Sequence, residues 1–156
     1  MLQDNKIILK AKSKYEMIKL KPYSASILTV GGLLLSAMGA YFIFLRPSLL
    51  PEDLRYMHIS LSAVENNISN LTGWLQNVFW VMGSYIFTTG LLTMYVAQTS
   101  FRTRTRGAFV VILIAGITSI GSMTIVNFIL QSDFKWVLLT FTLPWITSLI
   151  LYHFHK

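Results

Sequence analysis

The chain has 156 residues, of which 54% are hydrophobic and 12% charged, and its formal net charge is +7. Soluble proteins average about 25% charged residues, so this composition argues against an ordinary soluble domain. The chain contains no cysteine, which excludes disulfides, thiol chemistry and sulfur-ligated metals.

Long uncharged stretches give the class of protein. Residues 23–45, 74–98, 107–130 and 136–152 contain no Asp, Glu, Lys, Arg or His. Each is long enough to cross a hydrocarbon core of about 30 Å as a helix. The sequence therefore predicts an all-α polytopic membrane protein, with four transmembrane helices in an up-down bundle. We expect residues 1–156 to form one integral membrane domain.

Residues 1–22 precede the first span and are rich in lysine. The first apolar run is too long for a secretory signal, so we expect it to be retained as a span. Within the basic segment, Ile8, Ala11, Tyr15 and Ile18 recur at helical spacing. This spacing fits an amphipathic helix on the inner leaflet. The alternative is a disordered basic tail that acts only as a topology signal.

The first span carries small residues at intervals of four, namely Gly32, Ser36 and Ala40. Residues four apart share one face of a helix, and small side chains let two helices approach closely in a membrane. These residues are therefore candidates for helix packing. The face packs either within the bundle or against a second copy of the chain.

Residues 46–73 form a charged loop between the first two spans. Pro51, Glu52 and Asp53 suit the first turn of a short helix, where acids complement the helix dipole. The loop is the most plausible surface for a partner, and its candidate contact residues are Arg46, Glu52, Asp53, Arg55, Tyr56 and His58. Farther along, Leu61, Val64, Ile68 and Leu71 predict an amphipathic helix. This helix is expected to cap the bundle, or else to lie on the outer surface, where it could bind a partner.

The stretch Arg-Pro-Ser-Leu-Leu-Pro-Glu-Asp-Leu-Arg-Tyr-Met, residues 46–57, resembles phrases in small, uncharacterised four-span bacterial membrane proteins. The resemblance is confined to this stretch. It implies a bacterial cytoplasmic membrane and no particular activity.

A few polar residues and one proline lie within the spans. Gln76 and Asn77 near the start of the second span and Asn127 near the end of the third are expected at similar depth. They are predicted to hydrogen-bond to one another as packing residues, or else to line a small polar vestibule. Pro144 is predicted to kink the fourth span.

The basic residues predict the orientation in the membrane. Arg102, Arg104 and Arg106 lie in a short loop without acids, and lysines dominate residues 1–22. Basic residues near span ends stay in the cytoplasm, so both termini and this loop are expected inside, with residues 46–73 and 131–135 outside. Anionic headgroups of the inner leaflet account for the net charge, and no nucleic-acid partner is expected.

The spans lack the ionisable groups that pumps and proton-coupled carriers need. No catalytic triad, zinc-protease motif or phosphate-binding loop is present. His153 and His155 point to different sides of a helix, which disfavours a metal site. We therefore expect no enzyme, cofactor or metal.

The leading hypothesis is an interaction or assembly component that contacts a membrane protein or itself through residues 46–73 and the small-residue face. The alternative is a small oligomeric channel or facilitator.

Overall fold

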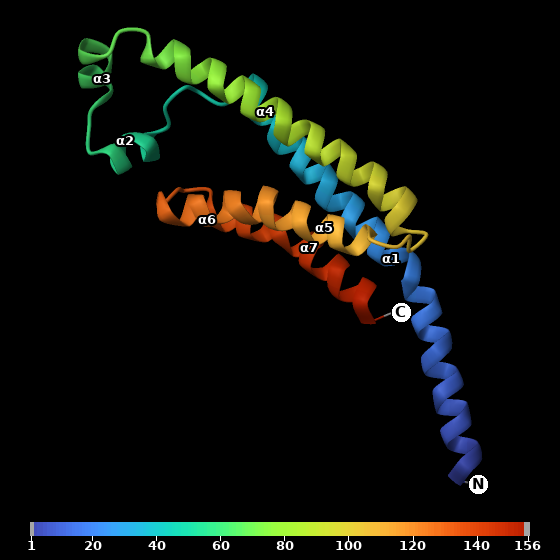
Figure 1. The fold of residues 1–156 in the computed structure, drawn as a ribbon. Helices are drawn as coiled ribbons and strands as arrows, with labels where there is room; N and C mark the ends of the chain where they lie inside the picture. Colours follow the sequence, from blue (N-terminus) through green and yellow to red (C-terminus); the bar gives the residue numbers. More distant parts are fainter. Residues whose placement is uncertain (1, 155–156) are drawn as a thin grey trace.

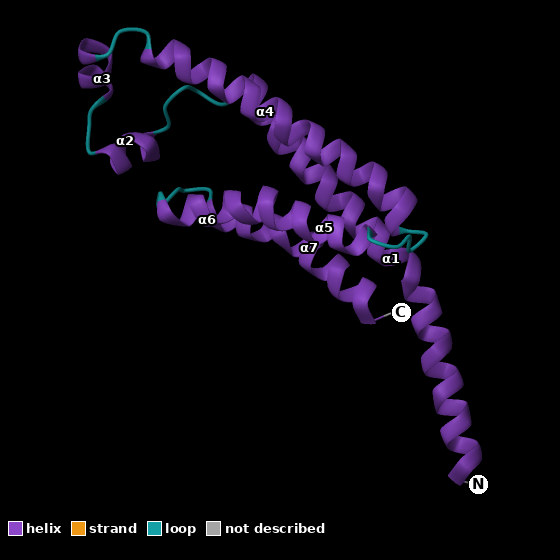
Figure 2. Cartoon of the chain, viewed as in Figure 1, coloured by secondary structure: helices purple, strands orange, loops and turns teal. Residues whose placement is uncertain are grey.

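The computed structural model describes residues 2–154, and it describes the side chains from Tyr23 onward. The described residues form helices joined by short loops, with no strand among them (Figure 2). In chain order the elements are α1 (Leu2–Phe44), α2 (Pro51–Met57), α3 (Leu61–Asn67), α4 (Leu71–Val96), the π-helical turn η1 (Ala97–Phe101), α5 (Ala108–Gly116), the π-helical turn η2 (Ile117–Gly121), α6 (Ser122–Ile129) and α7 (Lys135–Phe154).

Four helical segments are long and apolar enough to cross a membrane, as the uncharged stretches predict. They are Tyr23–Phe44, Leu71–Phe101, Ala108–Ile129 and Lys135–Phe154. The predicted all-α class with four membrane-spanning helices is therefore confirmed. The second segment is longer than the predicted stretch of residues 74–98, since it begins at Leu71 and extends through η1 to Phe101. The residues just outside the predicted stretch continue the helix at both ends.

The N-terminal basic segment is helical and continuous with the first span. α1 is a single helix of 43 residues, and its first half projects away from the bundle (Figure 1). The prediction that this segment is helical agrees with the structure. The structure gives a helix here in place of a disordered tail, and this helix runs on into the first span. That it lies on the inner leaflet stays a prediction.

α1 packs against α4 through small residues. A Cβ atom added to Gly32 would lie 2.9 Å from the Gly90 carbonyl oxygen, so the two backbones are in close contact. Ser36 is buried on the same face and donates a hydrogen bond to the Phe87 carbonyl at 3.5 Å, while Ala40 is half-buried. The structure thus places Gly32 and Ser36 in the contact with α4. Because α4 occupies this face, a second copy could reach it only by displacing α4.

A neighbouring face of α1 packs against α7, which also contacts α5 and α6. Trp145 of α7 is 2% exposed and lies between Gly31 of α1 and Gly116 of α5. Nearby, the Ser148 hydroxyl donates to the Ser24 carbonyl at 2.8 Å. α7 remains one helix through Pro144.

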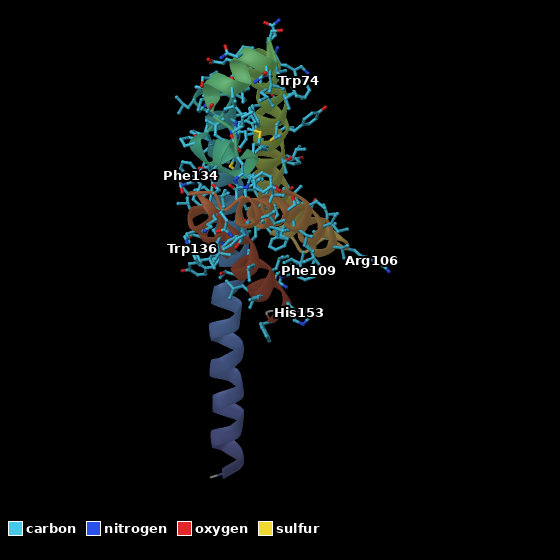
Figure 3. All side chains as sticks on the ribbon, turned by 90° about the vertical axis from the view of Figure 1, so that its left-hand side faces the viewer. Trp74, Arg106, Phe109, Phe134, Trp136 and His153 are labelled. Carbon is cyan, nitrogen blue, oxygen red and sulfur yellow. The ribbon has the colours of Figure 1, made fainter. Side chains whose placement is uncertain are left out.

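The span segments form two antiparallel pairs, α1 with α4 and α5–α6 with α7. In Figure 1 the pairs lie close together near the loop of residues 102–107 and diverge toward α2 and α3. We call these the arginine-loop end and the α2–α3 end. Figure 3 shows Trp74 near the α2–α3 end, with Arg106 and His153 at the other.

The second helix of the 46–73 loop is shorter than predicted. α3 ends at Asn67, and Asn70 adopts a left-handed conformation with φ of 65° before α4 starts. α3 therefore lies beyond the end of α4, where Val64 is buried and Leu61 and Ile68 remain exposed (Figure 1). The prediction that this helix caps the bundle is wrong. α2 is the element that reaches across to the other helix pair.

Candidate partner-contact site

α2 begins and ends with clear local signals. Pro51 occupies the first turn, and Asp53 Oδ2 accepts a hydrogen bond from the Leu50 amide at 2.8 Å. A side-chain acceptor at this place satisfies an amide that the helix itself leaves unpaired. His58 ends the helix in a left-handed conformation with φ of 54°. The predicted helix start at Pro51 is confirmed.

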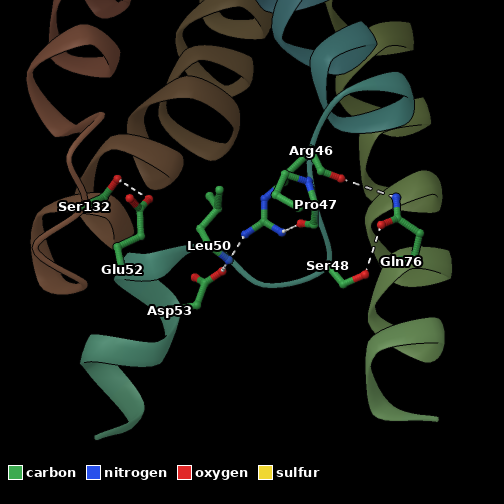
Figure 4. Close-up of polar contacts among 8 residues, drawn as sticks. All are labelled: Arg46, Pro47, Ser48, Leu50, Glu52, Asp53, Gln76 and Ser132. Atoms are coloured by element: carbon green, nitrogen blue, oxygen red, sulfur yellow. Dashed lines mark hydrogen bonds and ion pairs between the residues drawn. The ribbon is translucent and has the colours of Figure 1, made fainter. Parts of the chain in front are cut away.

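Arg46 is the centre of a buried polar cluster at the entrance to α2 (Figure 4). Its guanidinium donates to Asp53 Oδ2 at 3.1 Å and to the Pro47 carbonyl at 3.0 Å. The same group lies 3.5 Å from the centre of the Phe79 ring and 5.3 Å from that of Phe42. The side chain of Arg46 is only 8% exposed. We call this set, with its neighbour Gln76, the Arg46 cluster.

Two opposing effects act on the pKa of Arg46, namely its burial and its pairing with the carboxylate of Asp53. Burial lowers the pKa of the Arg46 guanidinium, while Asp53 opposes that shift through its charge and hydrogen bond. Arginine stays protonated in proteins, so the cluster keeps its positive charge. Gln76 of α4 donates to the Arg46 carbonyl at 3.4 Å and accepts from the Ser48 hydroxyl at 3.1 Å. These bonds tie the end of the first span to α4.

Two contacts join α2 to the turn between α6 and α7. The Ser132 hydroxyl donates to Glu52 Oε1 at 2.7 Å, and these residues are 1% and 5% exposed. Arg55 pairs with Asp133 at 2.9 Å, with both side chains more than half exposed. The hydrogen bond to Asp133 raises the pKa of Arg55. The buried contact holds α2 in place, since solvent screens an exposed ion pair.

The six predicted contact residues therefore divide into two groups. Arg46 and Glu52 are buried, Asp53 is half-buried, and all three bond within the protein, so the structure does not present them to a partner. Arg55 is exposed but already paired. Tyr56 is 54% exposed, and His58 is also exposed.

The consecutive residues from Tyr56 to Leu61 are all exposed. Tyr56, Met57, Ile59 and Leu61 are 37–54% exposed, and His58 lies among them. We call this surface the Tyr56–Leu61 patch. It joins the end of α2 to the start of α3, outside the predicted spans.

The predicted group of three polar amides does not assemble. Asn127 donates to the Met123 carbonyl of its own helix at 2.9 Å, and Gln76 is part of the Arg46 cluster. Asn77 lies exposed on α4. The prediction that Asn127 packs helices through these amides is wrong, because the two helix pairs diverge at this depth.

A second arginine is held at the opposite end of the molecule. Arg104 donates to the Tyr152 carbonyl at 3.0 Å, and its guanidinium lies 4.5 Å from the centre of that ring. The Phe101 ring packs against Tyr152 with centroids 4.4 Å apart. Arg102 and Arg106 are exposed. Arg104 thus fastens the loop to the end of α7, where a cation complements the helix dipole.

The possible histidine pair cannot be followed, because His155 lies outside the described residues. His153 is exposed, and its ring centroid is 6.4 Å from that of Phe109. Among the side chains that the structure describes, from Tyr23 to Phe154, no group of three or more potential ligands is placed to hold a metal ion.

Several residues that position α2 carry no signal in the sequence. Ser132 lies 80 positions from Glu52, and Asp133 is similarly distant from Arg55. Phe79 looks like an ordinary apolar residue of a span. No periodicity or motif connects such pairs before the chain folds.

The geometry defines a polytopic membrane protein with a short helical segment fastened across one end. No protein-family model, curated protein or solved structure matches the chain.

Proposed function

We propose that this protein is a non-enzymatic interaction or assembly component of a membrane, which contacts a protein partner through the Tyr56–Leu61 patch. The observation that carries the proposal is the exposure of Tyr56, Met57 and Leu61 beside a firmly held helix. Aromatic residues and methionine are enriched at protein interfaces. A patch of such residues on a positioned element fits a docking surface.

The firm attachment of α2 supports this proposal. The Arg46 cluster fixes the start of α2, and the contact between Glu52 and Ser132 fixes its far side. A partner that binds a preorganised surface pays less conformational entropy than one that binds a flexible loop. The patch is thus presented in a defined orientation.

The same contacts support a non-enzymatic role. Glu52, Asp53 and His58 are the acid–base residue types of this end. Glu52 is directed at Ser132, and Asp53 is engaged by Arg46 and the Leu50 amide. His58 lies on the exposed patch. The three groups are not directed at one common point, as general acid–base catalysis requires.

We also propose that the arginine-loop end and both termini face the cytoplasm of a bacterial cell. Arg102 and Arg106 are exposed at this end, as the positive-inside rule expects. Anionic headgroups of the inner leaflet would then surround these arginines. The Tyr56–Leu61 patch would face the outside, and its partner would be another membrane protein or an external domain.

The absence of cysteine makes the proposal testable by site-specific crosslinking. Single cysteines are introduced as Tyr56→Cys and His58→Cys, with Ser69→Cys as an exposed control between α3 and α4. Each variant is treated in native membranes with a thiol-reactive photocrosslinker. We expect a discrete product of higher mass from positions 56 and 58, and a much weaker one from position 69.

Solely monomeric products at all three positions would refute a partner on this patch. Equal products at all three would indicate random collision and would also count against it. Reporter fusions to the C-terminus test the orientation separately, and a non-cytoplasmic reporter would refute it.

A further inference from the structure

The face of α4 that points away from α1 is broadly exposed, with Trp74, Tyr85 and Leu92 among its exposed side chains. Along its middle runs a regular stripe of residues. Its members are Asn77, Val81, Ser84, Thr88, Leu91 and Tyr95, and all are exposed in the structure. The residues of α4 that meet α1, including Gly83 and Gly90, are buried on the other side. We call the exposed set the α4 stripe.

The spacing of the α4 stripe is that of a helix-pairing seam. Its residues alternate at intervals of four and three, so positions repeat every seven residues. A seven-residue repeat keeps one face of a helix against a partner helix in a left-handed pair. From Asn77 to Tyr95 the stripe runs roughly 27 Å along the axis, which is close to the thickness of the hydrocarbon core.

The chemistry of the stripe does not suit lipid. The side chains of Asn77, Thr88 and Tyr95 make no hydrogen bond to the part of the chain that the structure describes. By contrast, the exposed hydroxyls of Thr118 and Ser122 bond to carbonyls of their own helix. Ser84 is the exception among the polar residues of the stripe, since its hydroxyl donates to the Trp80 carbonyl at 2.9 Å. Lipid tails offer no partner to an amide or hydroxyl, so polar groups on a span find partners across helix contacts.

The stripe is complementary to itself. Asn, Thr and Tyr side chains each act as both donor and acceptor, so a residue can bond to its own counterpart. Copies of one chain insert with the same orientation, and a two-fold axis along the membrane normal places identical residues opposite each other. Such symmetry pairs Asn77 with Asn77 and Thr88 with Thr88.

We propose that the α4 stripe is the interface with a second copy of this chain, in a parallel two-stranded α4 pair. Asn77 sets the register, as a single polar seam residue does in two-stranded coiled coils. At the same end of the seam, Trp74, Asn77, Val78 and Val81 line a shallow groove of about 290 Å³. This groove receives a side chain of the partner helix.

Disulfide crosslinking in native membranes tests the seam. Ser84→Cys and Leu91→Cys are compared with Met82→Cys, which is 41% exposed on the same helix. Met82 lies two residues before Ser84 and so roughly 160° round the helix. We expect rapid disulfide dimers at positions 84 and 91 and at least tenfold slower formation at position 82. Equal rates at the three positions, or a faster rate at position 82, overturn the proposal.

A second measurement uses the purified protein in lipid nanodiscs and light scattering. The expected mass is that of two chains, and a monomer or an assembly of three or more chains overturns the proposal. Thr88→Ala and Asn77→Ala are each expected to weaken the dimer about threefold, the size of a typical membrane hydrogen bond. Thr140→Ala is the matched control, because Thr140 is exposed but bonds to the Trp136 carbonyl of its own helix. An equal loss with the control also overturns the proposal.

The inference does not depend on the proposed function. Crosslinks at positions 84 and 91 report on α4, and products from positions 56 and 58 report on the Tyr56–Leu61 patch. Each set of results can fail while the other stands.

Discussion

Helix α1 packs against α4 and against α7 in two different ways. Toward α4, glycines allow direct contact between backbones, and Gly39 meets the backbone of Phe87 in α4. Toward α7, the large ring of Trp145 fills the space beside Gly31. The first contact depends on the absence of side chains and the second on the presence of one. The two contacts should therefore respond differently to substitution.

The largest expected effect is at the glycine contact. A Cβ atom on Gly39 would overlap the backbone of Phe87, and no rotamer change relieves a backbone clash. We expect Gly39→Leu to prevent accumulation of folded protein, measured by size-exclusion chromatography of a fluorescent fusion. Gly73 has no neighbour within 4 Å of such an atom. The control Gly73→Ala should instead stabilise α4, by up to about 1 kcal/mol. A well-folded Gly39→Leu variant would contradict the close contact.

The next effect is at Trp145. Removal of a buried tryptophan ring costs about 3–5 kcal/mol, because it removes contacts and leaves a cavity. We expect Trp145→Ala to lower the free energy of unfolding by that amount in detergent micelles. Trp145→Phe should retain most of the stability, because the indole nitrogen has no hydrogen-bond partner among the described residues. Trp136, which is 63% exposed, provides the control. Equal losses from Trp136→Ala and Trp145→Ala would contradict the filled contact.

A smaller effect is expected at the Arg46 cluster, which is held by hydrogen bonds and an ion pair. Asp53→Asn leaves Arg46 buried without its charged partner, which costs about 1.5–3 kcal/mol. The thermal unfolding midpoint should fall accordingly. Glu65→Gln is the matched control, because Glu65 is exposed on α3. An unchanged midpoint for Asp53→Asn would show that the cluster contributes little.

The smallest effect is expected at the exposed pair of Arg55 and Asp133. Both side chains are more than half in solvent, so screening removes most of the attraction. We expect Arg55→Ala to leave the unfolding midpoint unchanged at physiological salt. A clear decrease would show that this pair, and not only the buried contact of Glu52, fastens α2.

Much of the fold follows from local features of the sequence. The uncharged stretches predict the four spans, because charge is costly in hydrocarbon wherever the span lies in the bundle. The four-residue interval between Gly32 and Ser36 also predicts a packing face, because residues four apart share one side of any helix. The start of α2 is predictable as well, since Pro51 and Asp53 act within one helical turn.

Other features were decided only by the tertiary structure. Arg46, Glu52 and Asp53 look like surface charges in the sequence, but their partners bring them inside. Glu52 is buried because Ser132, far away in the chain, meets it at the end of the second helix pair.

The sequence by itself determined which segments enter the membrane, because hydrophobicity acts on each segment separately. The tertiary structure alone decided which faces of those segments are occupied. It placed α4 on the small-residue face of α1 and left the α4 stripe open, because helix pairing depends on the relative position of several segments at once.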